Sequence, residues 1–296
     1  MVIVNWNSGD MLATCLDGLA AHCANVIGQV IIVDNASTDS SLDFPMPTSL
    51  EVDLIRSGCN LGFAAACNLG ASRSGADFLL FANPDLVIGQ DILTQPLRRL
   101  RGDATIGAVG IGLYDAGSGQ RQRTCCRLPT PISMLARSLG IDRLWPRLGY
   151  RLSGWDHSSS RKVDHVIGAC YLTPRAVFDR LGGFDERFFL YLEDLDFSAR
   201  IQQAGMDILY LANPCASHVG GGSSRQIKDE RLFYMLRSRL QYVHKHMGVW
   251  GLIIVGFSTL AIEPWLRILA SVLAGSVTGC GEVLRGYGRL YRWLGS

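Results

Sequence analysis

Short apolar runs that alternate with helical stretches constrain the fold of the first 112 residues more than any other feature of this chain. Such runs fit strands buried on both faces, and their alternation with helices indicates βα units and a mostly parallel sheet. The predicted strands are Val2–Asn5, Val30–Asp34, Val52–Ile55, Phe78–Ala82 and Ile106–Ile111, and helices between them include Met11–Cys23 and Phe63–Ala71. The sequence therefore predicts an α/β fold with a doubly wound, mostly parallel sheet.

Two of these strands end in acidic and amide side chains. Val30–Asp34 runs into Asn35, and Phe78–Ala82 stops at the tripeptide 83–85, which reads Asn-Pro-Asp. Ligands of open α/β sheets bind beyond the carboxyl ends of the strands. We therefore expect Asp34 and Asp85 to face one binding crevice.

A third acidic signal is the cluster Glu193, Asp194 and Asp196, inside an otherwise apolar, helix-forming run. Carboxylates beside aromatic neighbours are costly to bury unless they have partners or a use. We interpret the cluster as catalytic and expect Asp196 to cap the helix that follows, from about 194 to 203. The alternative without chemistry is a helix amino terminus, where the helix dipole favours acidic side chains.

The second half of the chain is less regular. From 114 to 162 periodicity fades and eight arginines recur, which indicates a solvated basic loop or contacts to phosphate or lipid head groups. Beyond it the sequence predicts a strand at Val163–Leu172, a helix at Arg175–Leu181, a strand at Ile208–Leu211, and a basic amphipathic helix from about 228 to 246.

Composition excludes some classes of protein. The 296 residues carry 28 basic and 26 acidic side chains, so no nucleic-acid partner is expected. The nine cysteines contain no Cys-x-x-Cys pair, which favours reduced thiols in the cytosol. No signal-peptide pattern is present, and no Gly-x-Gly-x-x-Gly turn follows the first strand, which argues against an oxidoreductase.

The end of the chain is apolar in two stretches. Residues 247–262 and 268–280 carry no charge, and Glu263, Pro264 and Arg267 separate them. Each stretch is shorter than the roughly 20 residues of a spanning helix, and tryptophans and arginines flank them. We favour two helices lying in the membrane interface over a tilted or hairpin span and over a soluble dimer face.

These segments together resemble an inverting glycosyltransferase of the large nucleotide-sugar family two, with the GT-A fold. Within that family the chain is most similar to bacterial rhamnosyltransferases that build cell-envelope polysaccharides. The resemblance covers about three quarters of the chain and rests on residues 2–19, 31–41, 60–70, 83–85, 168–205 and 217–218.

The resemblance implies a role for each motif. Asp34 matches the residue that binds the nucleobase, with Asn35 beside it, and a carboxylate can accept from a pyrimidine N–H. The remaining donor-binding residues expected from the match are Asn5, Asn7, Asn60, Asn68 and Asn83. Taken alone, the Asp34-Asn35 pair could be a turn cap, and Asn60 and Asn68 could be plain helix caps.

The resemblance also implies a metal and a base. Asn83-Pro84-Asp85 stands where the family has Asp-x-Asp, so Asp85 would hold Mg²⁺ or Mn²⁺, while Asn83 departs from the two-acid pattern. His218 matches a histidine that can complete the metal or diphosphate shell, although a lone histidine can also be structural. Asp194 matches the general base, and Glu193 would orient the acceptor or tune Asp194.

We therefore predict an enzyme that moves a sugar, L-rhamnose from dTDP-L-rhamnose, to a lipid-linked saccharide at the cytoplasmic face of the cell membrane. Residues 1–112 would bind the nucleotide-sugar, 113–225 would bind the acceptor and carry catalysis, and 226–296 would associate peripherally or monotopically with the membrane. Another hexosyl or galactofuranosyl donor and a non-catalytic nucleotide-sugar-binding scaffold are the alternatives.

Overall fold

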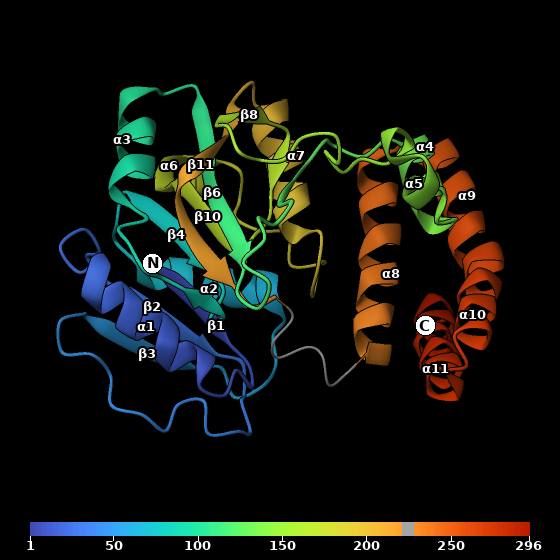
Figure 1. The fold of residues 1–296 in the computed structure, drawn as a ribbon, viewed down its shortest axis with the longest axis horizontal. Coiled ribbons are helices and arrows are strands. Elements are labelled where there is room, and N and C mark those ends of the chain that lie inside the picture. The colour runs from blue at the N-terminus through green and yellow to red at the C-terminus, as the bar shows by residue number, and fades with distance from the viewer. Residues whose placement is uncertain (221–227) are drawn as a thin grey trace. The chain divides into compact units, whose positions relative to one another are not determined.

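The computed structural model describes residues 1–220 and 228–296, and its ribbon is drawn in Figure 1. Contacts divide the chain into two compact units. The sheet unit comprises Met1–Arg127, Trp155–Glu186 and Glu193–Ser223, and the helical unit comprises Leu128–Gly154, Arg187–Leu192 and Ser224–Ser296. Each unit is built from segments that are far apart in the sequence.

A nine-stranded sheet forms the centre of the sheet unit, in the order β3-β2-β1-β4-β10-β6-β11-β5 with β8 on β11. The strands β3, β2, β1 and β4 run parallel, as do β6 and β11, whereas β10 lies antiparallel between the two groups. The bounds are β1 Val2–Asn5, β2 Val30–Asp34, β3 Val52–Arg56, β4 Phe78–Ala82, β5 Leu86–Val87, β6 Ile106–Asp115, β8 Arg161–Val163, β10 Cys170–Pro174 and β11 Asp207–His218. A separate ribbon pairs β7 (Cys125–Cys126) with β9 (His165–Val166).

Helices cover this sheet because their apolar faces match its buried strands. The helix α1 buries Leu12, Cys15 and Leu16 in the core that also contains Ile3. In α2 the glycine at 70 permits close approach, since a Cβ there would lie 2.4 Å from Val2 Cγ1. The helix bounds are α1 Met11–His22, α2 Phe63–Arg73, α3 Thr94–Gly102, α6 Arg175–Arg180 and α7 Glu193–Gln203.

The predicted α/β class with a mostly parallel sheet is confirmed, and so are the first five strands. Two later predictions are wrong in extent. The strand expected at 163–172 splits into β9 and β10, because the backbone N–H of Gly168 bonds to Asp194 rather than to a neighbouring strand. The strand expected at 208–211 continues to His218, and a register shift between Leu211 and Cys215 accommodates Pro214, which has no N–H to donate.

The helical unit is an all-α assembly with its own core. Leu236, Leu240, Val283, Tyr287 and Leu290 form the buried cluster. Part of the segment expected to be a basic loop is helical here, and a capping box at Thr130 begins its first helix. The bounds are α4 Pro131–Ser138, α5 Ile141–Leu144, η1 Pro146–Leu148, α8 Lys228–His246, α9 Gly248–Phe257, the π-helical turn η3 Ser258–Ile262, α10 Glu263–Leu273 and α11 Val277–Leu294.

The two apolar stretches do not separate as the sequence suggests. Pro264 follows the π-helical turn η3, and such a local change in helix geometry accommodates the backbone group that a proline leaves unpaired, so α9, η3 and α10 run on as one helix from Gly248 to Leu273. By length and composition this helix could cross a membrane, and 28% of its most apolar window is buried within the structure.

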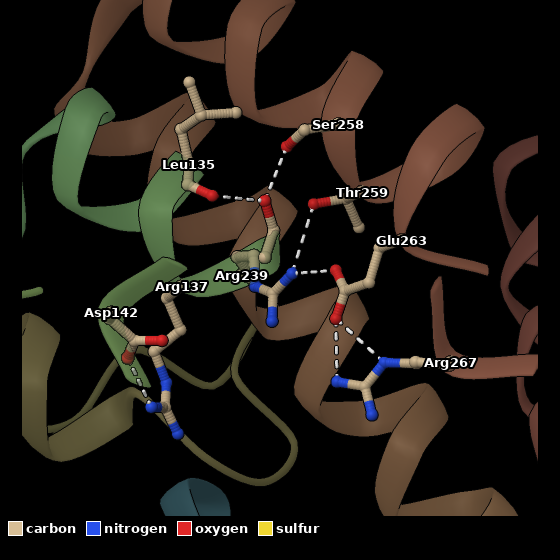
Figure 2. Close-up of polar contacts among 9 residues, drawn as sticks. Leu135, Arg137, Asp142, Arg239, Ser258, Thr259, Glu263 and Arg267 are labelled. Atoms are coloured by element: carbon tan, nitrogen blue, oxygen red, sulfur yellow. Dashed lines mark hydrogen bonds and ion pairs between the residues drawn. The ribbon is translucent and has the colours of Figure 1, made fainter. Parts of the chain in front are cut away.

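Buried charges hold this long helix inside the helical unit. Figure 2 shows the guanidinium of Arg239, on α8, pointing at the carboxylate of Glu263, to which it donates a hydrogen bond. Arg267 donates two further bonds to the other carboxylate oxygen, at 2.9 and 2.7 Å, and Arg239 also reaches Thr259 at 3.3 Å. Glu263 is 2% exposed, so the breaking of this cluster would leave a charge buried without its partner.

Candidate active site

Polar side chains from distant segments gather at one edge of the sheet in the sheet unit. The carboxyl ends of β1, β2 and β4 lie at this edge, with Asn5 opposite Asp34 in the register. The antiparallel β10 begins there, and the N–H of Asn83 bonds to the carbonyl of Ala169 at 3.0 Å. The edge therefore brings together the end of β2, the Asn83–Asp85 turn and the start of β10.

Asp34 is a buried carboxylate fixed by its neighbours. Asn5, which is fully buried, donates to Asp34 Oδ1 at 2.9 Å, and the backbone N–H of Ser37 approaches Asp34 Oδ2 at 3.3 Å. The amide of Asn5 also donates to the hydroxyls of Ser37 and Ser41. The structure thus places Asn5 as a support for Asp34.

The other predicted donor-binding asparagines hold loops at this edge. Asn7 accepts from the N–H of Thr38 at 2.7 Å, and Asn35 donates to the carbonyl of Gly62 at 3.0 Å. Asn60 accepts from the N–H of the same glycine at 3.0 Å. These bonds shape the turn that leads into α2.

Asn68 lies on α2, and its side chain bonds to the segment at 184–186. Its amide donates to the carbonyl of Phe184 at 2.8 Å, and its side-chain oxygen accepts from the N–H of the same residue at 2.9 Å. The amide also reaches Glu186 Oε1 at 2.9 Å. This geometry gives Asn68 a positioning role and lends no support to its assignment to donor binding.

Asp85 and His218 face each other across the strand pair β5 and β11. His218 Nε2 lies 3.2 Å from Asp85 Oδ1, out of line for a hydrogen bond, and both atoms are buried without a hydrogen-bond partner. Asp85 Oδ2 accepts from the N–H of Gly220 at 3.0 Å. Burial would raise the pKa of Asp85, but the adjacent His218 and the N–H of Gly220 together lower it below its usual value, so the carboxylate is ionised.

Gln122 orients this histidine. Its side-chain oxygen lies 2.9 Å from His218 Nδ1, and its amide donates to the His218 carbonyl at 3.0 Å. Because an amide oxygen can only accept, Nδ1 carries a proton, and this contact turns Nε2 toward Asp85.

The pair has the donor set of a divalent-cation site. A buried carboxylate oxygen and a buried imidazole nitrogen, both without hydrogen-bond partners, fit Mn²⁺ or Mg²⁺, for which oxygen and histidine ligands are ordinary. Within residues 1–220 and 228–296, no three His, Cys, Asp or Glu side chains gather closely enough to hold a metal. Of the described residues, these two would serve as ligands, so a bound substrate would have to supply others.

Asp194 lies in the first turn of α7, next to Gly168. Its Oδ2 accepts from the N–H of Gly168 at 2.6 Å, and its Oδ1 accepts from the N–H of Leu195 at 2.8 Å. A Cβ at position 168 would lie only 3.2 Å from Oδ2, so the glycine permits this approach. The side chain remains 16% exposed, which leaves it accessible to a substrate.

A buried polar network lies behind Asp194. His165 Nε2 is 3.8 Å from Asp194 Oδ2, and His165 Nδ1 is 2.9 Å from the hydroxyl of Ser198, which also lies 3.1 Å from the hydroxyl of Tyr171. Burial lowers the pKa of His165 and outweighs the attraction of Asp194, so the imidazole is neutral at neutral pH.

Glu193 differs from its neighbour. It is 5% exposed, and its Oε2 has no hydrogen-bond partner. Burial and the nearby charge of Asp194 raise the pKa of Glu193 well above its usual value. Burial and charge therefore favour the protonated form of Glu193, which cannot act as a base while it holds its proton.

Asp196 does not cap the helix as expected. It is fully buried and pairs with Arg200 one turn later on α7, with Arg200 Nε 2.8 Å from Asp196 Oδ2. This contact replaces the expected backbone cap, because an i,i+4 pair along a helix places acid and base side by side.

Backbone strain occurs at several residues that are predicted site residues or lie close to them in the sequence. Four residues other than glycine have positive φ next to predicted site residues: Asn7 at 49°, Ala36 at 60°, Tyr191 at 68° and Leu192 at 66°. Such conformations cost of order 1–3 kcal/mol each and cluster at functional sites. Tyr191 and Leu192 immediately precede Glu193 and thus set the start of α7.

Sequence reasoning missed His165, Ser198 and Gln122. A histidine within an apolar run was the available signal for His165, whereas nothing in the sequence marked the other two. Gln122 lies 96 residues from His218, and Ser198 lies 33 residues from His165. Only the fold brings these pairs together.

The profile of a known protein family matches this chain and agrees with its fold. Residues 1–181 match glycosyl transferase family 2, which is more than half of the chain. The fold and the polar sheet edge define a nucleotide-sugar transferase. The chain belongs to glycosyl transferase family 2, and it is a glycosyltransferase.

The chain is similar to several individual proteins. The N-acetylglucosaminyl-diphospho-decaprenol L-rhamnosyltransferase of Mycobacterium tuberculosis is 26% identical over 266 residues, which cover 84% of this chain and 85% of that protein. The rhamnosyltransferase WbbL of Escherichia coli is 23% identical over 168 residues, covering 56% of this chain and 61% of that protein. Among solved structures, the mannosyltransferase PcManGT of Pyrobaculum calidifontis, in complex with GDP-Man and Mn²⁺, superposes with a TM-score of 0.56 at 16% identity, covering 97% of this chain and 78% of that one.

Proposed function

We propose that this glycosyltransferase moves L-rhamnose from dTDP-L-rhamnose to a lipid-linked saccharide with inversion at the anomeric carbon. The observation that carries the proposal is the placement of Asp34, Asp85 with His218, and Asp194 at one sheet edge. The mycobacterial relative, whose name specifies rhamnose and a diphospho-decaprenol acceptor, supports the choice of substrates.

In this proposal two parts of the sheet edge bind the nucleotide. The carboxylate of Asp34, held by Asn5, accepts a hydrogen bond from the pyrimidine ring N–H. Asp85 and His218 would hold a divalent cation that neutralises charge on the diphosphate. Gln122 keeps Nε2 of His218 directed at that position.

Asp194 takes the role of general base. It receives the proton of the acceptor hydroxyl as that oxygen bonds to the anomeric carbon and the bond to the donor diphosphate breaks. The N–H of Gly168 fixes the orientation of the carboxylate. Glu193 stays neutral and buried beneath it, so we assign it to positioning and not to proton transfer.

Membrane association rests on the helical unit. Nearly all large apolar side chains that are exposed among the described residues belong to this unit, with Trp250 74%, Trp265 71% and Leu273 80% exposed. The helix that carries them also holds Glu263, which pairs with Arg239 on the charged helix α8. Because a full span would draw these charges into the bilayer, we infer that the helix lies in the membrane interface, on the cytoplasmic face.

The test measures transfer of labelled sugar from a panel of nucleotide-sugars, with Mn²⁺, to polyprenyl diphosphate-linked N-acetylglucosamine. We expect dTDP-L-rhamnose to be the best donor, and to raise the melting temperature most. Preference for another hexose or for galactofuranose would overturn the donor assignment. Two results together would favour a scaffold. The protein would bind a donor but transfer no sugar, and a variant without both Asp85 and Asp194 would still function in a complementation assay.

A further inference from the structure

We propose that an apolar pocket in the helical unit binds the polyprenyl chain of the lipid-linked acceptor. This inference rests on the proposed function and adds a site for the part of the acceptor that does not react. The pocket is formed by α8, α9, η3, α11 and the segment at 187–188, all within one unit, and has a volume of about 500 Å³.

The walls of the pocket suit a hydrocarbon. Phe188 and Leu240 are buried and form its floor with Gly256, while Phe257 and Leu294 line it and are also exposed, so they lie at the mouth. The volume falls within the range of roughly 300–1,000 Å³ in which proteins enclose small ligands. A half-open apolar pocket of this size, with apolar side chains at its opening, fits a flexible chain that enters from a bilayer.

Basic side chains in and beside the pocket favour a chain with an anionic head. Arg187 and His244 both line the pocket and are exposed, and the Lys245 Nζ lies 5.9 Å from the centre of the Phe188 ring. Among the described residues that line the pocket, none is acidic. A diphosphate attached to the chain would therefore meet positive charge where it leaves the pocket.

Sequence adjacency favours the acceptor over a bulk lipid as the occupant. Phe188, on the floor, precedes Glu193 by five residues and the proposed base Asp194 by six. The segment that shapes the pocket is thus covalently continuous with the start of α7. We therefore favour, as the occupant, a lipid whose head group carries the reacting sugar over a phospholipid.

Gly256 offers a clean test of the pocket. An added Cβ at this position on α9 would meet no atom within 4 Å, although the residue is buried and lines the pocket. Gly256→Leu therefore places an apolar side chain in the pocket from a position where its first atom meets no neighbour. Gly288, on α11 outside the pocket, also has no atom within 4 Å of an added Cβ, so Gly288→Leu is the matched control.

The experiment measures binding of a fluorescent geranylgeranyl diphosphate by anisotropy to the full chain. We expect Gly256→Leu to weaken binding at least about tenfold, Gly256→Ala to weaken it less, and Gly288→Leu to stay within about twofold of the wild type. Association with phosphatidylcholine vesicles should be the same for all four proteins. Unchanged binding in Gly256→Leu, an equal loss in Gly288→Leu, or a parallel loss of vesicle association would overturn the proposal.

Sugar-transfer assays distinguish a failure of the pocket proposal from a failure of the proposed function. If the wild type transfers rhamnose but the probe binds equally to Gly256→Leu, the pocket is rejected and the function stands. If Gly256→Leu loses probe binding while the wild type transfers no sugar from any donor, the pocket stands and the function is rejected. Gly256→Leu should also transfer normally to a soluble, short-chain analogue of the acceptor.

Discussion

Replacement of Glu193 by glutamine should change how the stability of the protein depends on pH. Glu193 is buried and unpaired at Oε2, and burial together with Asp194 raises its pKa well above the usual value. The folded state therefore keeps a proton that the unfolded state loses above about pH 4.3. The stability that this group contributes is complete below the unfolded pKa and is lost as pH rises toward the folded pKa.

The size of the effect follows from linkage. Each pH unit between the unfolded and folded pKa values lowers the free energy of unfolding by about 1.4 kcal/mol, so a rise of two pH units within this window costs about 3 kcal/mol. A small globular domain has only about 5–15 kcal/mol in total. Glutamine has the same shape and no proton to lose, so Glu193→Gln removes this slope.

The measurement is urea unfolding of the wild type and the variant at several pH values. Subtraction of the two curves cancels every other titrating group, and we expect the variant to become progressively more stable than the wild type as pH rises. Glu51→Gln, at an exposed position, is the control and should run parallel to the wild type. Parallel curves for Glu193→Gln would refute the view of Glu193 as a buried neutral acid.

Three further predictions concern other parts of the molecule. Glu263→Gln should destabilise the helical unit by about 3–5 kcal/mol in denaturant unfolding, because the buried Arg239 and the half-buried Arg267 lose their charged partner. Glu282→Gln, which removes a surface pair with Lys228, should cost less than about 1 kcal/mol. Gln122→Leu should weaken Mn²⁺ binding about 10- to 100-fold, seen as a loss of the metal-dependent thermal shift with nucleotide-sugar; an unchanged shift would exclude its orienting role. Gly168→Ala should lower kcat about 100-fold with donor KM unchanged, since its Cβ crowds the carboxylate of Asp194, and a normal kcat would contradict the placement of that side chain.

Local pattern was enough to predict the first half of the fold. The strands ending at Asn5, Asp34 and Ala82 were readable because each is a short apolar run that stops at polar residues. The placement of Asp34 and Asp85 at one edge followed, since parallel strands share the edge at which they end.

The rest of the fold and of the candidate site depends on contacts between residues that are far apart in the sequence, which no local pattern predicts. The break at Gly168 exists because Asp194, 26 residues away, takes its N–H, and the extension of β11 depends on pairing with β6 and β5. The charge state of Glu193 is a result of tertiary burial. The union of two apolar stretches into one helix depends on Arg239, which satisfies the charge of Glu263 from another helix.

The most direct test of the central claim is to compare donor binding with sugar transfer in Asp194→Asn. If Asp194 is the base, the variant should bind dTDP-L-rhamnose and Mn²⁺ as the wild type does, because the nucleotide is held by Asp34 and by Asp85 with His218. Its rate of transfer should fall by about 10²–10⁴-fold. Transfer at a near-normal rate, or loss of donor binding in step with activity, would contradict the account.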